Sequence, residues 1–565
     1  MPAVAAQLIR IITMKRILRA VLLLISLSLI ATPAIAQDEV LKADWIMPEA
    51  PNQDPHQGIV FMEPTLYPSS TSYLISSDNN SSKYFTSEHV CKSINSDTCL
   101  TEKTISYQAY VPVCSDELSR NCIEDFWLVL NGKKFQPVLD TYMPTVSPLH
   151  FNGDSESNLP EGKSSSIWKI KDNELGNSEL LFAVSAIFTG STPRSNPKFG
   201  QPKISVVIDP VVNISGSYSL PVASKNGNGW SIGGCLHEGC GTNNIGYCAA
   251  IDVDKCAKRV NHINGVRYGI KLRITNPPIT WIHGRLLDSE FTTKSTSNGV
   301  TWSIEAEPTM LPVTSGWIAN SEYKQKMGVT LPRPEEGSWS GPLSSGTQAF
   351  QEFNKWIPFM GESAQAMQKR WSVATISSGE KINGKSLDSC LKPNAIAGLV
   401  VSNATVYQGE PPTWNSRDLT LDYKVAAPHL TSSGKEFLGI YQLKINSDFA
   451  RCIYGLQDVP LSATISVVST EGTNKIATSS IVMGSEWINF NVSGFTFSAP
   501  TIKVQVTEAK KEITTKSNNE VSKITSSPLT ATKKAKKTTV SCVKGKVTKE
   551  ITSINPKCPA GYKKK

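Results

Sequence analysis

Short runs with a two-residue hydrophobic period constrain the fold of this 565-residue chain more than any other feature. Residues 266–274 (VRYGIKLRI) alternate apolar with polar or small side chains, and residues 302–306 (WSIEA) do the same. This is the period of a half-buried β-strand, because successive side chains of a strand point to opposite faces. Turn-forming residues separate such runs, since the chain contains 37 glycines and 34 prolines. The sequence therefore predicts an all-β protein with two or more antiparallel β-sandwich-like modules, joined by one amphipathic helix and followed by a disordered basic tail.

One segment has the period of a helix instead. Residues 347–369 carry large apolar side chains at three- and four-residue steps, which predicts an amphipathic helix with a kink at Pro358. This helix falls between two strand-rich stretches. A single hydrophobic core for both stretches, about 460 residues together, is implausible, so at least two domains are expected.

The stretch after the helix has the strand count and spacing of an immunoglobulin-like sandwich. Its predicted strands are 398–408, 419–426, 437–445, 461–468, 475–482 and 487–498. The predicted division of the chain is a signal peptide (1–36), an N-terminal extension (37–57), a β-rich region of one or two modules (58–340), a helical connector (341–370), the immunoglobulin-like sandwich (371–506), a flexible linker (507–537) and a basic two-cysteine module (538–565).

The first 36 residues have the pattern of a secretory signal peptide. Four basic residues precede an apolar run of 12 residues, 20–31, and Ala34-Ile35-Ala36 predicts cleavage after Ala36. The run is too short to cross a hydrocarbon core, which needs about 20 residues, so no stable transmembrane segment is expected after cleavage. Met14 is an alternative start to Met1, because Lys15 and Arg16 follow it directly. The chain is therefore expected to be secreted.

The chain contains 12 cysteines, an even number that predicts a disulfide framework in an exported protein. Three pairs of neighbours each enclose seven residues and a fourth pair encloses four, which favours pairing of neighbours. The predicted disulfides are Cys91–Cys99, Cys114–Cys122, Cys235–Cys240, Cys248–Cys256, Cys390–Cys452 and Cys542–Cys558. A zinc site at Cys235, His237, Cys240, Cys248 and Cys256 is the alternative for one stretch, but we expect no bound metal.

Positive charge is concentrated at the C-terminus. Residues 531–565 hold 11 lysines against the single acid Glu550, whereas residues 37–530 carry a net charge of −5. Such a cluster is attracted to polyanions, and nucleic acid is not an expected partner outside the cell. The expected partner of the lysine-rich tail is therefore an anionic cell-envelope polymer.

No motif in the sequence identifies a catalytic residue or a cofactor. Residues 379–386 (GEKINGKS) match the phosphate-loop pattern, but Pro393 leaves no room for the helix that this motif requires, so we interpret them as a surface turn. Neither a Gly-x-Ser-x-Gly elbow nor a His-Glu-x-x-His helix occurs. The paired carboxylates Asp252/Asp254, also candidate calcium ligands, and Glu305/Glu307 could serve a glycosidase only at a suitable separation in space.

Residues 281–285 (WIHGR) are the weak candidate for a ligand-binding face. Alternation places Trp281, His283 and Arg285 on one side of a strand. An aromatic ring beside a guanidinium and an imidazole suits recognition of a carbohydrate or a carboxylate. The alternative is that Trp281 packs in the core, with His283 and Arg285 satisfied at its edge.

Several segments carry a resemblance to known proteins: 279–288 (ITWIHGRLLD), 423–430 (YKVAAPHL), 449–472 (FARCIYGLQDVPLSATISVVSTEG), 492–506 (VSGFTFSAPTIKVQV) and the tail 541–565. They resemble uncharacterised secreted or cell-surface proteins of Gram-positive actinobacteria. The tail is similar to a short module that ends many exported proteins of those bacteria, which implies attachment and no particular activity. We therefore expect a secreted binding or structural protein of unknown ligand, retained at the cell surface. The alternative is an exported carbohydrate-active enzyme, similar to glycoside hydrolases, on a β scaffold.

Overall fold

The computed structural model describes residues 55–507, apart from internal segments of which the longest are 78–89, 171–179, 234–247 and 377–384, together with residues 538–544, 547–553 and 563–564. The chain divides into two compact units, Met1–Ala509 and Lys510–Lys565. The predicted signal peptide and, beyond Thr507, the predicted linker lie outside the described residues. The described chain is mostly β-strand, as the sequence predicts.

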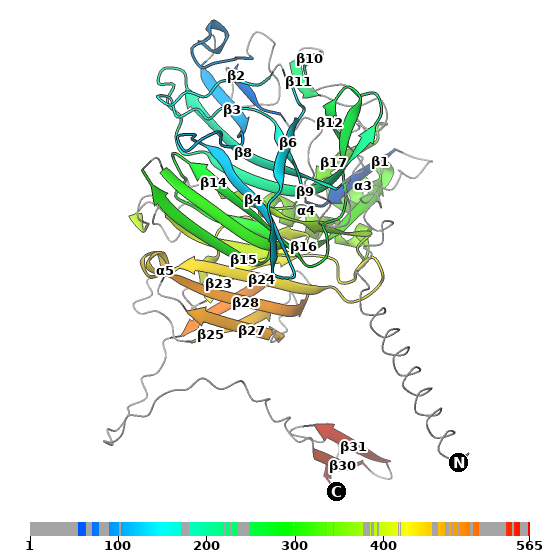
Figure 1. The fold of residues 1–565 in the computed structure, drawn as a ribbon. Helices are drawn as coiled ribbons and strands as arrows, with labels where there is room; N and C mark the ends of the chain where they lie inside the picture. The colour runs from blue at the N-terminus through cyan, green and yellow to red at the C-terminus, as the bar shows by residue number, and fades with distance from the viewer. Residues whose placement is uncertain are drawn as a thin grey trace, which may run out of the picture. The chain divides into compact units, whose positions relative to one another are not determined.

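The first half of the larger unit is built from two groups of antiparallel strands (Figure 1). In one group, β2 (Tyr73–Ser77), β3 (Thr104–Tyr110), β8 (Leu181–Pro193) and β9 (Lys203–Ser215) pair in this order. β7 (Ser165–Lys169) also pairs with β8, and β6 (Val138–Met143) pairs with β7. β13 (Lys255–Arg259) pairs with β9, and β12 (Cys248–Asp252) pairs with β13. The other group pairs β5 (Lys133–Phe135), β4 (Cys122–Leu130), β14 (Val266–Ile274), β16 (Gly299–Ala319) and β15 (Thr280–Thr296). β10 (Val222–Asn226) and β11 (Gly229–Gly233) form a separate pair, and η2 (Asp97–Leu100) is a short 3-10 helix.

The first core lies between these two groups. Phe126 of β4, Phe182 of β8 and Tyr268 of β14 are fully buried. The ring centroid of Phe182 lies 5.8 Å from that of Phe126 and 6.1 Å from that of Tyr268. Apolar side chains that alternate along each strand supply this core, which is why a period of two in the sequence locates the strands.

The two longest strands change partners along their length. Residues 280–285 of β15 pair with β19 (Ser372–Thr375) and β20 (Ile396–Ser402), whereas residues from Leu286 onward pair with β16. The change coincides with a bulge between Leu287 and Glu290, where Asp288 has a φ of 49°. A bulge bends a strand, so β15 connects two sheets.

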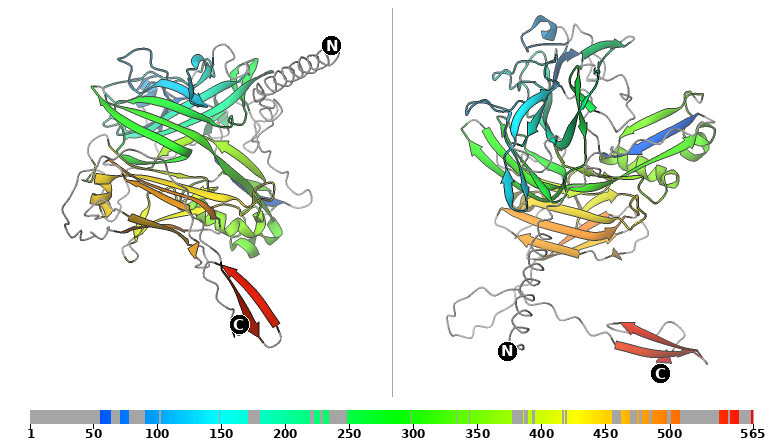
Figure 2. Two further views of the ribbon diagram at one scale, coloured as in Figure 1. Left: turned by 60° about the horizontal axis from the view of Figure 1, so that its bottom comes forward. Right: turned by 45° about the vertical axis from the view of Figure 1, so that its right-hand side comes forward.

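The end of β16 carries a smaller group of elements (Figure 2). β16 pairs there with β18 (Ala366–Arg370) and β1 (His56–Phe61), and β1 pairs in parallel with β17 (Ser338–Pro342). The helices α3 (Asn320–Met327) and α4 (Gly346–Met360) pack here. Phe61 of β1 contacts Phe353 of α4, with ring centroids 5.1 Å apart, and forms a separate small core.

The strands after residue 396 form the lower layer of Figure 1, yellow to orange. β20, β24 (Leu438–Asn446), β28 (Trp487–Thr496) and β27 (Thr478–Met483) make one antiparallel sheet. The second sheet pairs β23 (Thr420–Ala426), β29 (Thr501–Thr507), β25 (Ser462–Val468) and β26 (Asn474–Lys475), with β21 (Val406–Tyr407) and β22 (Thr413–Asn415) beside β23. The helix α5 (Ser447–Tyr454) places Phe449 in the second core.

β20 has both faces buried. Leu399 and Val401 belong to the first core, whereas Val400 between them belongs to the second. A strand covered on both sides has a continuous apolar sequence, as IAGLVVS does. β20, which belongs to the predicted sandwich of residues 371–506, pairs with β24 on one side and with β15 on the other. Because β15 precedes residue 371, backbone hydrogen bonds join the two predicted domains across that boundary.

The predicted helix over 347–369 is shorter in the structure. α4 ends at Met360, and residues 366–370 form strand β18. Pro358 lacks the N–H that a helix interior needs, and Gly361 follows with a φ of 73°, which L-residues rarely adopt. The sequence pattern also failed to indicate α5, which has only eight residues.

Three predicted disulfides are present: Cys91–Cys99, Cys114–Cys122 and Cys390–Cys452. Cys256 is also disulfide-bonded. The predicted pairs Cys235–Cys240, Cys248–Cys256 and Cys542–Cys558 involve side chains outside those that the structure describes.

Two strand glycines leave room for tryptophan rings. A Cβ on Gly269 would lie 2.0 Å from the ring of Trp127, and a Cβ on Gly398 would lie 2.2 Å from the ring of Trp281. Each ring therefore lies across the neighbouring strand where a side chain would otherwise stand.

The smaller unit contains a three-stranded sheet. β30 (Thr538–Lys544) is its central strand, and it pairs with β31 (Val547–Ser553) and β32 (Lys563–Lys564). The two-cysteine module of the predicted disordered tail thus has regular structure. Among the described residues of the whole chain, no helix is long and apolar enough to span a membrane.

Candidate ligand-binding cleft

The three residues predicted as a ligand-binding face lie on one side of β15, and that side faces the interior. Trp281 is completely buried, with its ring 5.7 Å from that of Phe449. Arg285 is 1% exposed. The structure thus corresponds to the alternative that the sequence left open, in which the tryptophan packs in the core.

Arg285 makes its contacts within the protein. Its Nε donates to Oε2 of Glu63 over 2.9 Å, and its Nη1 donates to the carbonyls of Ser402 (3.0 Å) and Ala404 (2.7 Å). The guanidinium carbon lies 4.1 Å from the ring centroid of Tyr407. Arg285 therefore joins β15 to the end of β1 and to the turn after β20.

His283 is held beside the same tyrosine. Its Nδ1 is hydrogen-bonded to the hydroxyl of Tyr407, and the ring centroids are 4.9 Å apart. Burial lowers the pKa of His283 to about 4, an effect that Arg285 reinforces and Glu63 opposes. The imidazole is therefore neutral at pH 7 and stabilises the packing of two elements.

A second buried ionic group lies nearby. Asp209 of β9 is fully buried, and its Oδ1 accepts a hydrogen bond from Nη1 of Arg370 over 3.0 Å, while Arg259 and His262 lie at 3.9 Å. Burial raises the pKa of Asp209 to about 6, and Arg259 opposes this shift. Arg370 also donates to the carbonyl of Glu63 over 3.3 Å, so both ionic groups meet at the end of β1.

A cleft with a volume of about 350 Å³ lies elsewhere on the larger unit. Its buried apolar lining includes Tyr107 of β3, Phe188 of β8, Leu159, Pro160 and Pro202. Its polar lining includes Arg120, Asn121, Asp154, Asn158, Glu161 and Asn276. This volume is within the range of about 300–1,000 Å³ that is typical of small-ligand sites.

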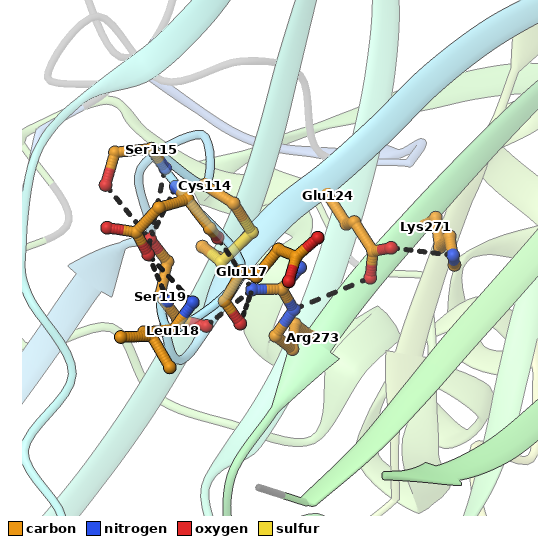
Figure 3. A network of polar contacts seen from close by, with 10 residues as sticks. Cys114, Ser115, Glu117, Leu118, Ser119, Glu124, Lys271 and Arg273 are labelled. Atoms are coloured by element: carbon orange, nitrogen blue, oxygen red, sulfur yellow. Dashed lines mark hydrogen bonds and ion pairs between the residues drawn. A yellow bond between two sulfur atoms is a disulfide. The ribbon is translucent and has the colours of Figure 1, made fainter.

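The loop that brings Arg120 and Asn121 to the cleft is rigidly built (Figure 3). The Cys114–Cys122 disulfide closes it. Nη1 of Arg273 on β14 donates to the carbonyls of Asp116, Glu117 and Ser119, each over 2.9 Å. Nη1 carries two hydrogens, so the three carbonyls share them, and the convergence of three carbonyls on one cation constrains the path of the loop.

Arg273 is itself held by a carboxylate. Its Nε lies 3.6 Å from Oε2 of Glu124, whose Oε1 accepts a hydrogen bond from Nζ of Lys271 over 2.7 Å, as Figure 3 shows. Inside the loop, Oδ1 of Asp116 accepts from the backbone amide of Ser119 over 2.7 Å and from its hydroxyl over 2.9 Å. The bond from the Ser119 hydroxyl is the main cause that lowers the pKa of Asp116. The loop is therefore held by contacts within the protein.

A hairpin-like segment, residues 151–162, contributes further lining residues to the cleft. Isolated bridges join Phe151 to Gly162 and Asp154 to Leu159. Oδ1 of Asp154 accepts from both the backbone amide and the hydroxyl of Ser157, each over 2.7 Å. These bonds lower the pKa of Asp154, the hydroxyl of Ser157 contributing most, so its carboxylate is ionised at neutral pH.

Two asparagines of the cleft have fixed amide orientations. Oδ1 of Asn121 accepts from the backbone amide of Thr275 over 2.9 Å, and Nδ2 of Asn158 donates to the carbonyl of Phe199 over 3.1 Å. Both residues have positive φ, 50° and 58°, which asparagine tolerates better than most residues. The first bond uses one lone pair of the Asn121 Oδ1 and neither Nδ2 hydrogen, and the second uses one donor of Asn158. The Nδ2 of Asn121 and the Oδ1 of Asn158 therefore remain as a donor and an acceptor for a ligand.

Sequence patterns did not indicate this cleft. Its polar residues come from the loop between Cys114 and Cys122, from the segment 154–161 and from the turn after β14, which are distant in the sequence. The one available signal was the seven-residue spacing of Cys114 and Cys122. Of the paired carboxylates considered from sequence, Glu305 is bound by Nε1 of Trp127 (2.7 Å) and Nε of Arg267 (2.7 Å) on a sheet face.

No protein-family model matches the chain, and a search of curated proteins finds no match.

Proposed function

We propose that this protein is an exported binding protein of the cell envelope, which binds a ligand in the cleft and is attached through its lysine-rich tail. Ligand binding in the cleft is supported by the polar groups at its rim, which are fixed in place. They are fixed by the hydrogen bonds of Arg273 to the loop, by the Cys114–Cys122 disulfide and by the hydrogen bonds of Asn121 and Asn158. Groups fixed in advance lose little conformational entropy when a ligand binds. Fixed, mixed donors and acceptors around an apolar floor favour ligand binding over a purely structural role.

The alternative, a glycoside hydrolase, has less support from the cleft. Such an enzyme needs one carboxyl group with a raised pKa to act as general acid. Asp154, one of the two carboxylates lining the cleft, has a lowered pKa instead, because Ser157 donates two hydrogen bonds to it. Glu161, the other, has its Oε1 2.8 Å from Nζ of Lys163, so this carboxylate is engaged in an ion pair within the protein.

Attachment rests on the charge of the tail. Residues 531–565 carry 11 lysines and one glutamate. The pairing of β30 with β31 and β32 places Lys549 and Lys564 opposite Cys542 in a compact sheet. Each lysine near an anionic surface contributes on the order of 1 kcal/mol before screening by salt. The predicted signal peptide and the disulfides are compatible with export into an oxidising compartment, and the proposed retention at the cell surface rests on the charge of the tail.

The region after residue 396 supports a more specific assignment, which we also propose: an immunoglobulin-like module that has become continuous with the preceding sheet. Its support is the pair of facing antiparallel sheets around the second core.

Cosedimentation with isolated cell envelopes tests the proposed attachment. We expect the complete mature protein to cosediment at low salt and to be released at high salt, because salt screens the lysines. A variant with the 11 tail lysines of residues 531–565 replaced by glutamine should stay in the supernatant. Equal retention of this variant would exclude attachment by charge and would favour a receptor that recognises the module.

A further inference from the structure

We propose that the cleft binds an uncharged saccharide, through hydrogen bonds to hydroxyl groups. This inference rests on the proposed function, because it names the ligand of the same cleft. The argument begins with the chemistry of the rim, which contains three asparagines, two carboxylates and one guanidinium: Asn121, Asn158, Asn276, Asp154, Glu161 and Arg120.

A sugar hydroxyl both donates and accepts a hydrogen bond, so a saccharide needs donors and acceptors close together. The cleft supplies both in fixed positions. Asn121 keeps both Nδ2 donors, since its bond from the backbone amide of Thr275 involves only Oδ1. Asn158 is left with its Oδ1 acceptor because one of its amide hydrogens is donated to the carbonyl of Phe199. The free oxygen of the Asp154 carboxylate is a second acceptor, since Ser157 binds only Oδ1.

The charges of the cleft exclude a strongly anionic ligand. Two carboxylates, Asp154 and Glu161, line it against the single guanidinium of Arg120. Asp154 is held ionised by the two hydrogen bonds from Ser157. A phosphate group would meet these carboxylates without a compensating cluster of cations, whereas an uncharged hydroxyl can donate to them.

The shape of the cleft agrees with a short saccharide. Its volume of about 350 Å³ is near the lower end of the usual range for ligand sites, which suits one or two sugar rings. The aromatic residues Tyr107 and Phe188 are 3% and 1% exposed, so their rings form the floor and offer little surface for stacking. Hydrogen bonds from the rim therefore determine the specificity for a hydroxylated ligand.

The key variant is Asn121→Asp. The new carboxylate keeps the size of the side chain and an oxygen for the amide of Thr275, so the loop retains its bond. It replaces the Nδ2 donor by an acceptor, which removes the hydrogen bond to a hydroxyl oxygen. Asn131→Asp is the matched control, because Asn131 also has a positive φ, 52°, and lies in the turn between β4 and β5, outside the cleft.

The test is a titration of the complete mature protein with saccharides, in which isothermal titration calorimetry and ligand-observed NMR detect binding. The probes are neutral mono- to tetrasaccharides of glucose, galactose, mannose, arabinose and N-acetylglucosamine, with inorganic phosphate and glycerol phosphate as anionic probes. We expect at least one neutral saccharide to bind saturably, Asn121→Asp to weaken that binding about tenfold, and Asn131→Asp to leave it unchanged.

Three outcomes would overturn the inference: saturable binding of the phosphate probes with no saccharide bound, equal saccharide affinity in wild type and Asn121→Asp, or no binding of any saccharide in the panel. If no saccharide binds while the protein still cosediments with envelopes through its lysines, only the ligand class is wrong. Equal saccharide affinity in wild type and Asn121→Asp would mean that the saccharide binds outside this cleft. If saccharide binding and cosedimentation both fail, the proposed function fails with it.

Discussion

Replacing Arg285 by methionine should strongly destabilise the larger unit. Methionine keeps most of the length of the side chain and removes the guanidinium, which pairs with Glu63 and donates to the carbonyls of Ser402 and Ala404. The side chain of Arg285 is 1% exposed and that of Glu63 is 13% exposed, so water has little access to the groups that the guanidinium binds. Water therefore replaces the lost donors only in part.

The expected loss follows from these contacts. Removing one partner of a buried ion pair costs about 3–5 kcal/mol, because the other charge is left uncompensated. Each buried carbonyl without a donor adds about 1 kcal/mol or more. We expect Arg285→Met to lower the free energy of unfolding by at least about 4 kcal/mol. The double variant with Glu63→Gln should lose less than Arg285→Met alone, because the lone buried charge is then absent.

Urea denaturation, followed by tryptophan fluorescence with the disulfides intact, measures this loss. Arg333→Met is the control, since Arg333 makes an exposed pair with Glu336 over 3.3 Å and its removal should change stability by less than about 1 kcal/mol. A loss below about 1 kcal/mol for Arg285→Met would refute the argument, because it would mean that water or other donors satisfy the same groups.

Three further predictions concern pH, packing and the cysteines. The pKa of His283 is lowered to about 4 in the folded protein, so between about pH 6.5 and pH 4 only the unfolded state gains this proton and the free energy of unfolding falls as the pH falls. His283→Gln should reduce the stability lost between pH 7 and pH 5, and an unchanged loss of stability would contradict the assignment. Gly398→Ala should lower the free energy of unfolding by about 1–3 kcal/mol and alter tryptophan emission, because the new Cβ would overlap the ring of Trp281. Gly341→Ala is the control in urea denaturation and should leave stability nearly unchanged, because a Cβ there meets no other atom. Thiol titration of the denatured, unreduced mature protein should find no free thiol, and two or more per chain would disprove the pairing of neighbouring cysteines.

Local patterns predicted the individual strands well. The alternation over residues 266–274 coincides with β14, because that strand is half-buried and its pattern depends only on its own two faces. Neighbouring cysteines were equally informative for Cys91–Cys99 and Cys114–Cys122, since a short loop limits the possible partners.

Features that depend on distant contacts were not predictable in the same way. The run IAGLVVS indicates a buried strand, but nothing in it reveals that β20 pairs with β15 on one side and β24 on the other. The same holds for residues 281–285, where alternation correctly grouped Trp281 with Arg285 without indicating that their side of the strand is interior. The cleft required Asn121, Asn158 and Asn276 to meet in space, and no local period links them.

The most direct test of the account is to incubate the complete mature protein with purified envelope polysaccharide and to measure retention and bond cleavage in the same samples. Binding without catalysis predicts saturable retention that Asn121→Asp reduces and Asn131→Asp does not, with no new reducing ends at any protein concentration. Release of new reducing ends in proportion to protein and time, lost when Glu161 is replaced by glutamine, would contradict the account and establish the protein as a hydrolase.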